Sequence, residues 1–305
     1  MARLLVLAWV LTALSVTNAN PIPPCSPSAY EYKSSPRAKL TPTISPSLIS
    51  VSVDPNSIPI ATTSATSYGC LALDWWPDSK CDYDWCPWVG ASFLNLDLSN
   101  NVLRKAIAAL APNDSEVFLR LSGSLCDFVR YDFPGSHDDE CRPFSDATNS
   151  TRIGYELGSG CLSTDRWDDL NSFCSDIPGC TLVFGINALY GRTNATCPEG
   201  TNCHWEYDDN PCCTEWSGDW DPSNAEALLR YTHDQGYPVY AFEFGNELIG
   251  NSGIESHISA EQYASDFCAL TELVASIWDE EDPKKPKVCV RERGGRGGSA
   301  RACEG

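Results

Sequence analysis

The chain has 305 residues, of which 42% are hydrophobic and 20% are charged, a composition typical of a globular protein with one large domain or two ordinary ones. Its formal net charge is −20 at pH 7. This acidic balance argues against a nucleic-acid-binding protein and against one that holds a polyanion on a broad basic surface. Neutral or singly acidic ligands are easier for such a surface to accommodate.

The first nineteen residues have the pattern of a secretory signal peptide. One basic residue, Arg3, precedes an apolar run over 4–14, and small residues lead to a cleavage point after Ala19. The run is too short to cross a bilayer, and no later stretch is apolar enough to do so. Sequons at Asn113, Asn149 and Asn194 agree with secretion. The sequence therefore predicts an extracellular or cell-wall protein, with vacuolar, lysosomal and membrane-associated destinations left open.

The sixteen cysteines of this chain predict disulfides rather than free thiols, because secreted proteins fold in an oxidising compartment. Their pairing does not follow from the sequence. One group has the composition of a zinc site, but it lacks C-x₂-C pairs, and disulfides are the better interpretation. We therefore expect no metal. The group consists of Cys197, Cys203, His204, Cys212 and Cys213.

The order of apolar segments divides the chain into a linker and a regular domain. Residues 20–66 are rich in Pro, Ser and Thr, with one candidate strand at 48–53. From residue 67 to 290, short apolar strands alternate with amphipathic helices. The predicted strands are 69–74, 117–121, 181–186, 239–244 and a candidate fifth at 286–290, and the predicted helices are 103–111, 162–174, 224–235 and a long one after Ser259.

Helix ends carry recognisable capping residues. Ser163 is a candidate N-cap, Gly236 a C-cap, and Ser259 an N-cap with Gln262 as its capping-box partner. The long helix that follows has an apolar stripe at helical spacing. The stripe consists of Tyr263, Phe267, Leu270, Val274 and Ile277.

Alternating strands and helices at these intervals indicate parallel β-α units, in which all strand ends meet at one edge. Each of the first four predicted strands ends in, or is soon followed by, a polar group: Asp74, Ser124, Asn187, and the pair Asn246 and Glu247. Their convergence on one pocket indicates an enzyme. The alternative for Glu247 is a surface turn after the strand.

The polar groups at this edge indicate carboxylate chemistry. The sequence has no histidine triad, no glycine-rich phosphate loop and no H-E-x-x-H, and its histidines lie in polar stretches where we expect them to be solvated (His137, His204, His233 and His257). Glycoside hydrolysis needs two carboxyl groups. Glu247 is the candidate general acid/base, and Asn246 beside it is a candidate hydrogen-bond partner for a sugar hydroxyl.

Several long stretches, in order, resemble the heparanase-like β-glucuronidases of glycoside hydrolase family 79, with the plant-type branch most similar. The resemblance implies an α/β fold: the N-terminal half of a (β/α)8 TIM barrel. It also implies no metal or organic cofactor. The stretches are residues 70–88, 92–112, 118–132, 161–174, 183–192 and 220–248.

The resemblance assigns roles to individual positions. The family's proton donor follows the fourth barrel strand in an Asn-Glu pair, which is similar to Asn246 and Glu247 here. Asp74 and Ser124 are similar to residues lining the family's sugar pocket, with a turn residue and a helix cap as the respective alternatives. The implied reaction is retaining hydrolysis of β-glucuronosyl bonds in a glucuronic-acid-containing glycan or proteoglycan.

The sequence departs from the family in three places. Residues 198–213 form a cysteine-rich insertion after the third strand. Only 305 − 247 = 58 residues follow Glu247, so the family's nucleophilic Glu, its remaining barrel strands and its β-sandwich domain are expected to be missing. The sequence from Cys289 onward, which includes the Gly/Arg-rich tail at 291–305, matches nothing in the family and indicates a gene-model error rather than an RGG-like nucleic-acid tail.

From these departures we expect the 305-residue polypeptide alone to be unstable or inactive. Two alternatives to a glycosidase stay open: a non-catalytic or degenerate sugar-binding protein of the same fold, and a disulfide-stapled structural protein. The second is disfavoured because the cysteines are interleaved with regular β-α units.

Overall fold

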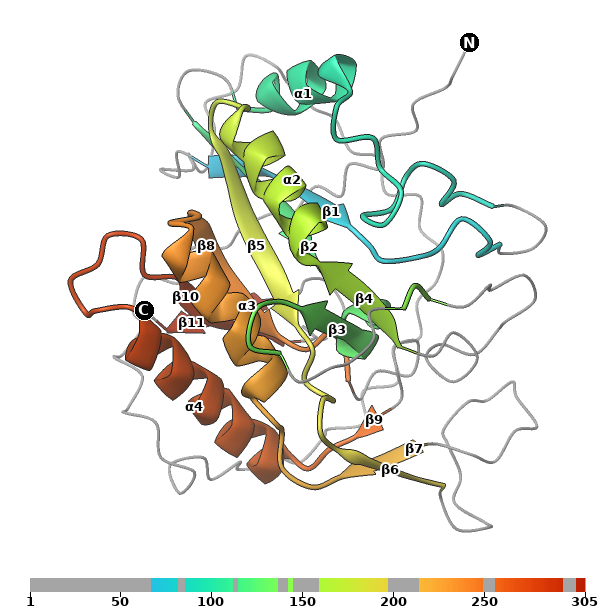
Figure 1. Ribbon diagram of the computed structural model, residues 1–305, viewed down its shortest axis with the longest axis vertical. Helices are drawn as coiled ribbons and strands as arrows, with labels where there is room; N and C mark the ends of the chain where they lie inside the picture. The colour runs from blue at the N-terminus through green and yellow to red at the C-terminus, as the bar shows by residue number, and fades with distance from the viewer. Residues whose placement is uncertain are drawn as a thin grey trace, which may run out of the picture.

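A computed structural model describes residues 67–81, 86–111, 115–136, 142–144, 159–196, 214–248, 256–292 and 300–304. Its main sheet has six strands in the order β1-β2-β5-β8-β10-β11 (Figure 1). Neighbours among the first five pair in parallel, whereas β11 pairs antiparallel with β10. The strands are β1 (Ser67–Leu73), β2 (Glu116–Leu121), β5 (Cys180–Ile186), β8 (Val239–Phe244), β10 (Lys287–Glu292) and β11 (Ala300–Glu304).

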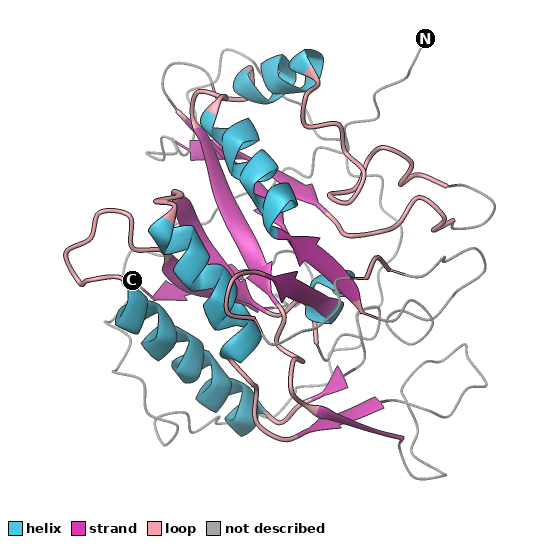
Figure 2. Cartoon of the chain, viewed as in Figure 1, coloured by secondary structure: helices cyan, strands magenta, loops and turns pink. Residues whose placement is uncertain are grey.

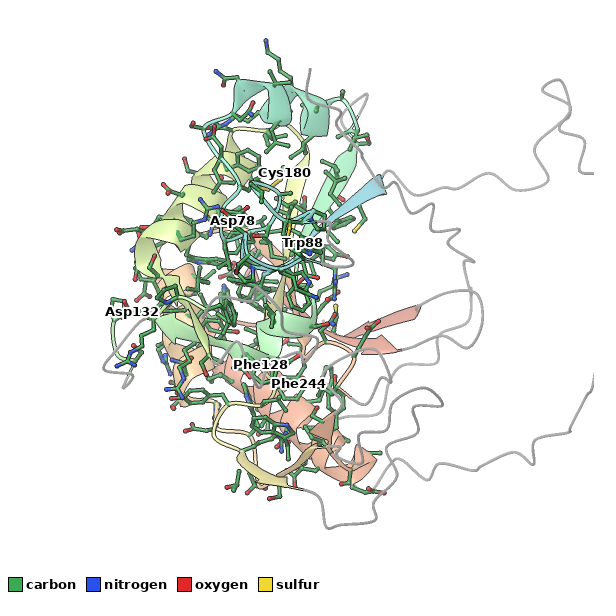
Figure 3. All side chains as sticks on the ribbon, turned by 90° about the vertical axis from the view of Figure 1, so that its right-hand side faces the viewer. Asp78, Trp88, Phe128, Asp132, Cys180 and Phe244 are labelled. Carbon is green, nitrogen blue, oxygen red and sulfur yellow. A yellow bond between two sulfur atoms is a disulfide. The ribbon has the colours of Figure 1, made fainter. Side chains whose placement is uncertain are left out.

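One helix follows each of the first four parallel strands, and the helices lie on one side of the main sheet (Figure 1, Figure 3). Successive strands therefore pair in chain order across a helical connection, as β-α units do. The predicted parallel α/β arrangement and the candidate fifth strand are confirmed, and the sheet is consistent with a partial (β/α)8 barrel. The helices are α1 (Asn101–Ala108), α2 (Thr164–Ser175), α3 (Ser223–Asp234) and α4 (Ala260–Ile277).

Two small sheets that the sequence did not predict stand beside the main one (Figure 2). They consist of four-residue and two-residue strands, too short to produce a periodic signal. The antiparallel pair β6–β7 brackets residues 197–213, so a hairpin carries the cysteine-rich insertion, which itself lies outside the described residues. The strands are β3 (Val129–Asp132), β4 (Gly160–Ser163), β6 (Thr193–Thr196), β7 (Thr214–Ser217) and β9 (Ser256–His257).

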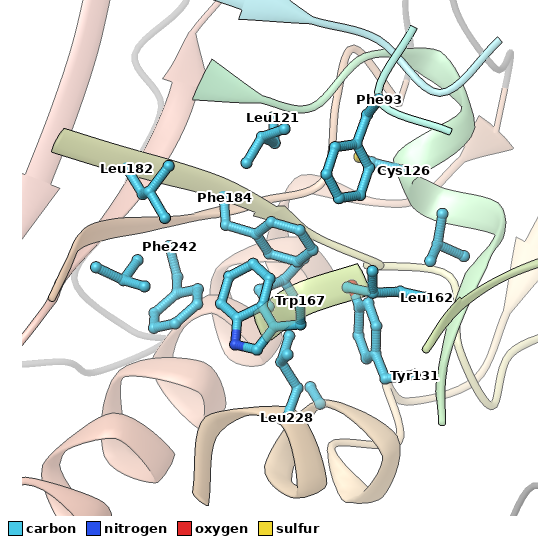
Figure 4. Close-up of a cluster of buried hydrophobic side chains, with 14 of the residues drawn as sticks. Phe93, Leu121, Cys126, Tyr131, Leu162, Trp167, Leu182, Phe184, Leu228 and Phe242 are labelled. Atoms are coloured by element: carbon cyan, nitrogen blue, oxygen red, sulfur yellow. The ribbon is translucent and has the colours of Figure 1, made fainter. Parts of the chain in front are cut away.

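The core fills the layer between the main sheet and the helices (Figure 4). Phe184 on β5 lies at its centre and contacts Trp167 edge-on, with ring centroids 4.9 Å apart. The centroid of its ring also lies within 6.5 Å of the ring centroids of Trp75, Tyr131 and Phe242. Edge-to-face contacts of this kind add about 0.5–1.5 kcal/mol each to the burial of the rings.

Alternation along β2 distinguishes the two faces of the sheet. Leu119 and Leu121 are buried in the helix-side core, so Phe118 and Arg120 face the opposite side. There Phe118 packs against a second, small cluster. Arg120 is therefore a charged residue on the face of the sheet opposite the helices. In a barrel this face forms the interior.

The helix ends match the predicted caps in part. Ser163 accepts from the N–H of Arg166, but the helix begins at Thr164, because Leu162 belongs to β4. Ser259 accepts from the N–H of Gln262, as predicted. The capping-box prediction for Gln262 is wrong: its side-chain amide donates to Asp266 and Asp219 instead.

The apolar stripe of α4 faces the core, with Leu270 and Val274 fully buried. Tyr263, Phe267 and Ile277 are partly buried against the same core. Gly236, just after α3, has φ +66°, the left-handed conformation expected of a C-cap glycine.

Disulfides are present, as predicted, but not at every described cysteine. Cys81 pairs with Cys86, and Cys174 pairs with Cys180, joining α2 to β5. Cys126 is a buried free thiol. Cys70 is also free, and Cys161, Cys268 and Cys289 are disulfide-bonded. The signal peptide, the candidate strand at 48–53, the sequons at Asn113 and Asn149 and the candidate zinc group lie outside the described residues.

Candidate active site

The carboxyl ends of β1, β2, β5 and β8 meet along one edge of the main sheet, here called the carboxyl edge. Backbone hydrogen bonds tie the segments just beyond these strands to one another: Ser122 N–H donates to Leu73 O, and Gly245 N–H donates to Ile186 O. The segments that sequence reasoning selected therefore lie next to one another, as expected for parallel strands.

Asp74, the first residue after β1, faces the segment after β2. A side chain at Gly123 would begin 2.3 Å from the Asp74 carboxyl carbon, so the carboxylate rests directly on the Gly123 backbone. One carboxylate oxygen also accepts from the next N–H, that of Trp75, at 2.8 Å. This local bond is typical of a turn residue, so Asp74 combines the turn geometry with a position at the carboxyl edge.

Ser124 is the first residue of the 3-10 helix η2 (Ser124–Phe128). The N-cap position belongs to Gly123, and no side chain caps this helix, so the helix-cap interpretation of Ser124 is wrong. Ser124 is half-buried at the start of the segment that faces Asp74. Its predicted contact with a sugar stays a prediction.

Asn187, directly after β5, is buried and bound to backbone on both sides of its amide. Its Nδ2 donates to Val129 O at 2.9 Å, and its Oδ1 accepts from Leu189 N–H at 2.8 Å. Its own N–H donates to the Tyr131 hydroxyl. The side chain thus holds β3 and the loop after β5 together, and its predicted role in substrate binding stays a prediction.

Asn246 is held at the carboxyl edge by a buried ion pair. Arg120 donates from Nη2 to Asn246 Oδ1 at 3.0 Å and from Nε to Glu243 Oε2 at 2.6 Å. Arg120 reaches across β5 to Glu243, and the β5 residue level with Glu243 is Gly185, which carries no side chain. The Arg120 guanidinium thereby binds both β8, through Glu243, and Asn246, the residue before Glu247.

Asp127, in η2, binds the segments after β5 and β8 together. Its Oδ1 accepts from Ala188 N–H at 2.9 Å, and its Oδ2 accepts from Asn246 N–H at 2.8 Å. The side chain is almost fully buried, at 1% exposure for the residue. The free thiol of Cys126 donates to Oδ2 at 3.5 Å.

Glu247 follows in an uncommon backbone conformation. Its φ is +49°, in the left-handed region that few non-glycine residues occupy, and Gly245 two residues earlier has φ +69°. Tyr263 on α4 donates its hydroxyl to Phe244 O at 2.6 Å, just before this turn. Glu247 itself is half-buried, so its side chain lies at the surface of the carboxyl edge rather than in the core.

A family model described as glycosyl hydrolase family 79, N-terminal domain, matches residues 49–294. The chain belongs to glycosyl hydrolase family 79. Heparanase-like protein 1 of Arabidopsis thaliana is 38% identical over 220 residues, which cover 72% of this chain and 36% of that protein. Baicalin-beta-D-glucuronidase of Scutellaria baicalensis is 38% identical over 226 residues, which cover 73% of this chain and 40% of that protein. The chain therefore spans little more than a third of the length of these relatives.

The buried acid in this family 79 domain has a strongly altered ionisation. Burial raises the pKa of Asp127 to about 7, against the opposing effect of the N–H groups of Ala188 and Asn246. Burial also raises the pKa of the Cys126 thiol, with the Asp127 charge as a second cause. The thiol therefore stays protonated and acts as a donor to its acidic neighbour.

A second buried ion pair lies next to the residues of the candidate site. Arg192 pairs with Asp266 of α4 and donates from Nε to Ala188 O at 2.9 Å. Asp266 Oδ1 also accepts from Trp220 N–H, and Trp220 Nε1 donates to Asn187 O. This network anchors α4 and the loop after β5 to each other, next to the residues that Asp127 binds.

Sequence reasoning missed the groups that hold this site together. Arg120 and Glu243 are charged residues inside otherwise apolar strands, and charged residues are seldom buried without a partner, so a pairing between them was open to inference. Asp127 lies in the Ser124–Phe128 segment, where no periodicity separates it from a surface acid. Among the described residues, no three or more His, Cys, Asp or Glu side chains gather as metal ligands would.

Proposed function

We propose that the protein containing this chain hydrolyses β-glucuronosyl bonds of glycans or proteoglycans, with Glu247 as the general acid/base. The observation that carries this proposal is the position of Asn246 and Glu247 directly after β8, at the carboxyl edge of a family 79 domain. One relative is named a baicalin-beta-D-glucuronidase, which supports a β-glucuronide as the substrate class.

In the proposed reaction, Glu247 starts protonated and donates its proton to the leaving glycosidic oxygen. A second carboxylate, about 5 Å away in retaining enzymes, attacks the anomeric carbon and forms a glycosyl-enzyme. The family resemblance assigns that nucleophile to a later barrel strand. Glu247 then takes a proton from water, which hydrolyses the intermediate with retention of configuration.

Around this reaction, Asn246 and Asp74 are proposed to bind the sugar. Asn246 Oδ1 accepts from Arg120, and this bond orients the Nδ2 group for a sugar hydroxyl. Asp74 lies on the neighbouring segment, against Gly123 and ahead of Ser124. The net charge of −20 suits a neutral or singly charged glycan better than a polyanion.

The direct test compares Glu247→Gln with the unaltered protein, both expressed from the complete open reading frame. A glucuronide with an alkyl or sugar leaving group depends on protonation, so its hydrolysis by the variant should fall by roughly 10²–10⁴-fold. Glu116→Gln is the matched control, because Glu116 is exposed at the first position of β2, at the opposite edge of the sheet. Sugar binding without turnover, unchanged in Glu247→Gln, would instead support a non-catalytic binding protein.

We also propose that the protein is secreted with residues 1–19 removed. Among the described residues, no helix has both the length and the apolarity to cross a membrane. Expression in a secreting eukaryotic host should release a protein that begins at Asn20 and loses mass on enzymatic removal of N-linked glycans. Retention in the cytosol with Met1 intact would contradict secretion.

A further inference from the structure

Asp127 joins three segments that are far apart in the sequence. From η2, after β2, it accepts hydrogen bonds from the N–H of Ala188, after β5, and the N–H of Asn246, after β8. Both distances, 2.9 and 2.8 Å, are those of good hydrogen bonds. One carboxylate thus fixes the backbone on which Asn246 and Glu247 are carried.

A carboxyl group is suited to this place because each of its two oxygens can accept a hydrogen bond in either protonation state. The two groups that it meets, Ala188 N–H and Asn246 N–H, are both donors. The amide of an asparagine would offer one acceptor oxygen and would turn an NH₂ group toward the other N–H. Since burying a carboxyl group is costly, its presence at 1% exposure calls for a compensating role.

The segment that Asp127 holds is strained. Glu247 has a φ of +49°, a left-handed conformation that is unfavourable for a residue other than glycine. Such a conformation persists only where its surroundings fix it. Asp127 fixes the peptide N–H of Asn246, and Arg120 fixes the side chain of the same residue.

We propose that Asp127 is a positioning residue for Glu247: its two hydrogen bonds hold the strained turn and set the direction in which Glu247 presents its carboxyl group. This proposal rests on the proposed function of Glu247 as the general acid/base. Asp127 itself is buried beneath the turn and takes no part in proton transfer. Arg120 still holds the Asn246 side chain when Asp127 is lost, so the loss acts on the placement of Glu247 more than on the affinity for the sugar.

The test is Asp127→Asn in the complete protein, assayed with the same glucuronide as Glu247→Gln. A misplaced acid/base should lower kcat by roughly 10- to 100-fold with KM little changed. Asp168→Asn is the matched control. Asp168 on α2 also accepts two hydrogen bonds, from the hydroxyls of Tyr231 and Tyr237, but it lies on the helix side of the molecule.

Amide hydrogen exchange gives a second measurement that does not depend on activity. In Asp127→Asn, the peptide covering 244–248 should exchange roughly tenfold faster or more, because the Asn246 N–H has lost its buried acceptor. Asp168→Asn should leave this peptide unchanged. If Asp127→Asn does not fold, the unaltered protein still tests the geometry: the amides of Ala188 and Asn246 should exchange roughly tenfold more slowly than the exposed amide of Gly135.

The outcomes separate the two proposals. Hydrolysis of the glucuronide by the unaltered protein but not by Glu247→Gln would support the function of Glu247. If Asp127→Asn then keeps the full kcat and slow exchange at 244–248, the positioning role of Asp127 is overturned while the function of Glu247 stands. Fast exchange at Ala188 and Asn246 in the unaltered protein overturns the positioning role too. If the unaltered protein shows no hydrolysis, or if Glu247→Gln keeps it, the function of Glu247 fails first and the positioning role fails with it.

Discussion

Asp127 gives the molecule a specific dependence of stability on pH. Its pKa is about 7 in the folded protein, against an ordinary value of 3.8 that we expect in the unfolded chain. Between about pH 4 and pH 7 the folded state therefore holds a proton that the unfolded state has released. The contribution of this group to the free energy of unfolding is fully present below pH 4 and is lost as the pH rises through 7.

We therefore predict that Asp127→Asn removes part of this slope. The free energy of unfolding, measured by urea denaturation from pH 4 to pH 8, should fall less steeply with rising pH in the variant than in the unaltered protein. Asp132→Asn, at an exposed carboxylate on β3, is the control and should keep the original slope. Parallel curves for all three proteins would show that Asp127 titrates at an ordinary value.

The backbone at position 123 requires glycine. Its φ of +117° is open in practice to glycine alone, and a Cβ there would begin 2.3 Å from the Asp74 carboxyl carbon. Gly123→Ala should therefore lower the melting temperature and displace Asp74 from the carboxyl edge. Gly135→Ala is the matched control: φ is +90° there, but nothing lies within 4 Å of the added methyl group. Equal losses in the two variants would mean that backbone strain alone matters and that the contact with Asp74 does not.

At the scale of the elements, the ion pair between Arg192 and Asp266 ties α4 to the loop after β5. Both side chains are at most 6% exposed. Arg192→Met should reduce the free energy of unfolding by about 3–5 kcal/mol, because it leaves a buried carboxylate without its partner. The comparison is Arg230→Met, which removes an exposed pair with Glu226 on α3 and should cost less than about 1 kcal/mol. Similar losses measured by urea denaturation would contradict the distinction between the two pairs.

The regular elements were predictable because their apolar residues recur with the right period. In the part of the chain that the structure describes, the four α-helices and the five parallel strands coincide with predicted segments to within a few residues. The misses have local causes. β4 occupies Gly160–Ser163, so Leu162 lies in a strand although its spacing fits the following helix. Gln262 has the capping-box position, but its side chain is oriented so that Nε2 donates to Asp266 and Asp219.

The location of Asn246 and Glu247 at the carboxyl edge was predictable from the sequence. The buried groups that hold them there were not. Asn246 and Glu247 were found because they follow a strongly apolar strand. Asp127 was not, because its two hydrogen bonds reach backbone groups 61 and 119 residues away. Contacts of this range depend on the parallel pairing of whole strands, which a local sequence pattern does not encode.

For the molecule as a whole, the fold and the proposed reaction meet at the carboxyl edge of the main sheet. A parallel sheet brings the ends of β1, β2, β5 and β8 to one edge, and buried charges below that edge hold the turn that carries Glu247. The chain belongs to glycosyl hydrolase family 79, and in the proposed reaction this turn carries the general acid/base that hydrolysis of a glycosidic bond requires. The proposed function therefore depends on the role of Glu247 as the general acid/base.

That role is tested most directly by azide rescue of Glu247→Ala, expressed from the complete open reading frame. With 4-nitrophenyl β-glucuronide the leaving group departs without protonation, so a glycosyl-enzyme forms; azide, which needs no general base, then displaces the enzyme carboxylate. We predict slow hydrolysis by the variant, acceleration by azide, and β-glucuronosyl azide as the product. Full activity without azide, or no acceleration and no glycosyl azide from a folded variant, would contradict that role.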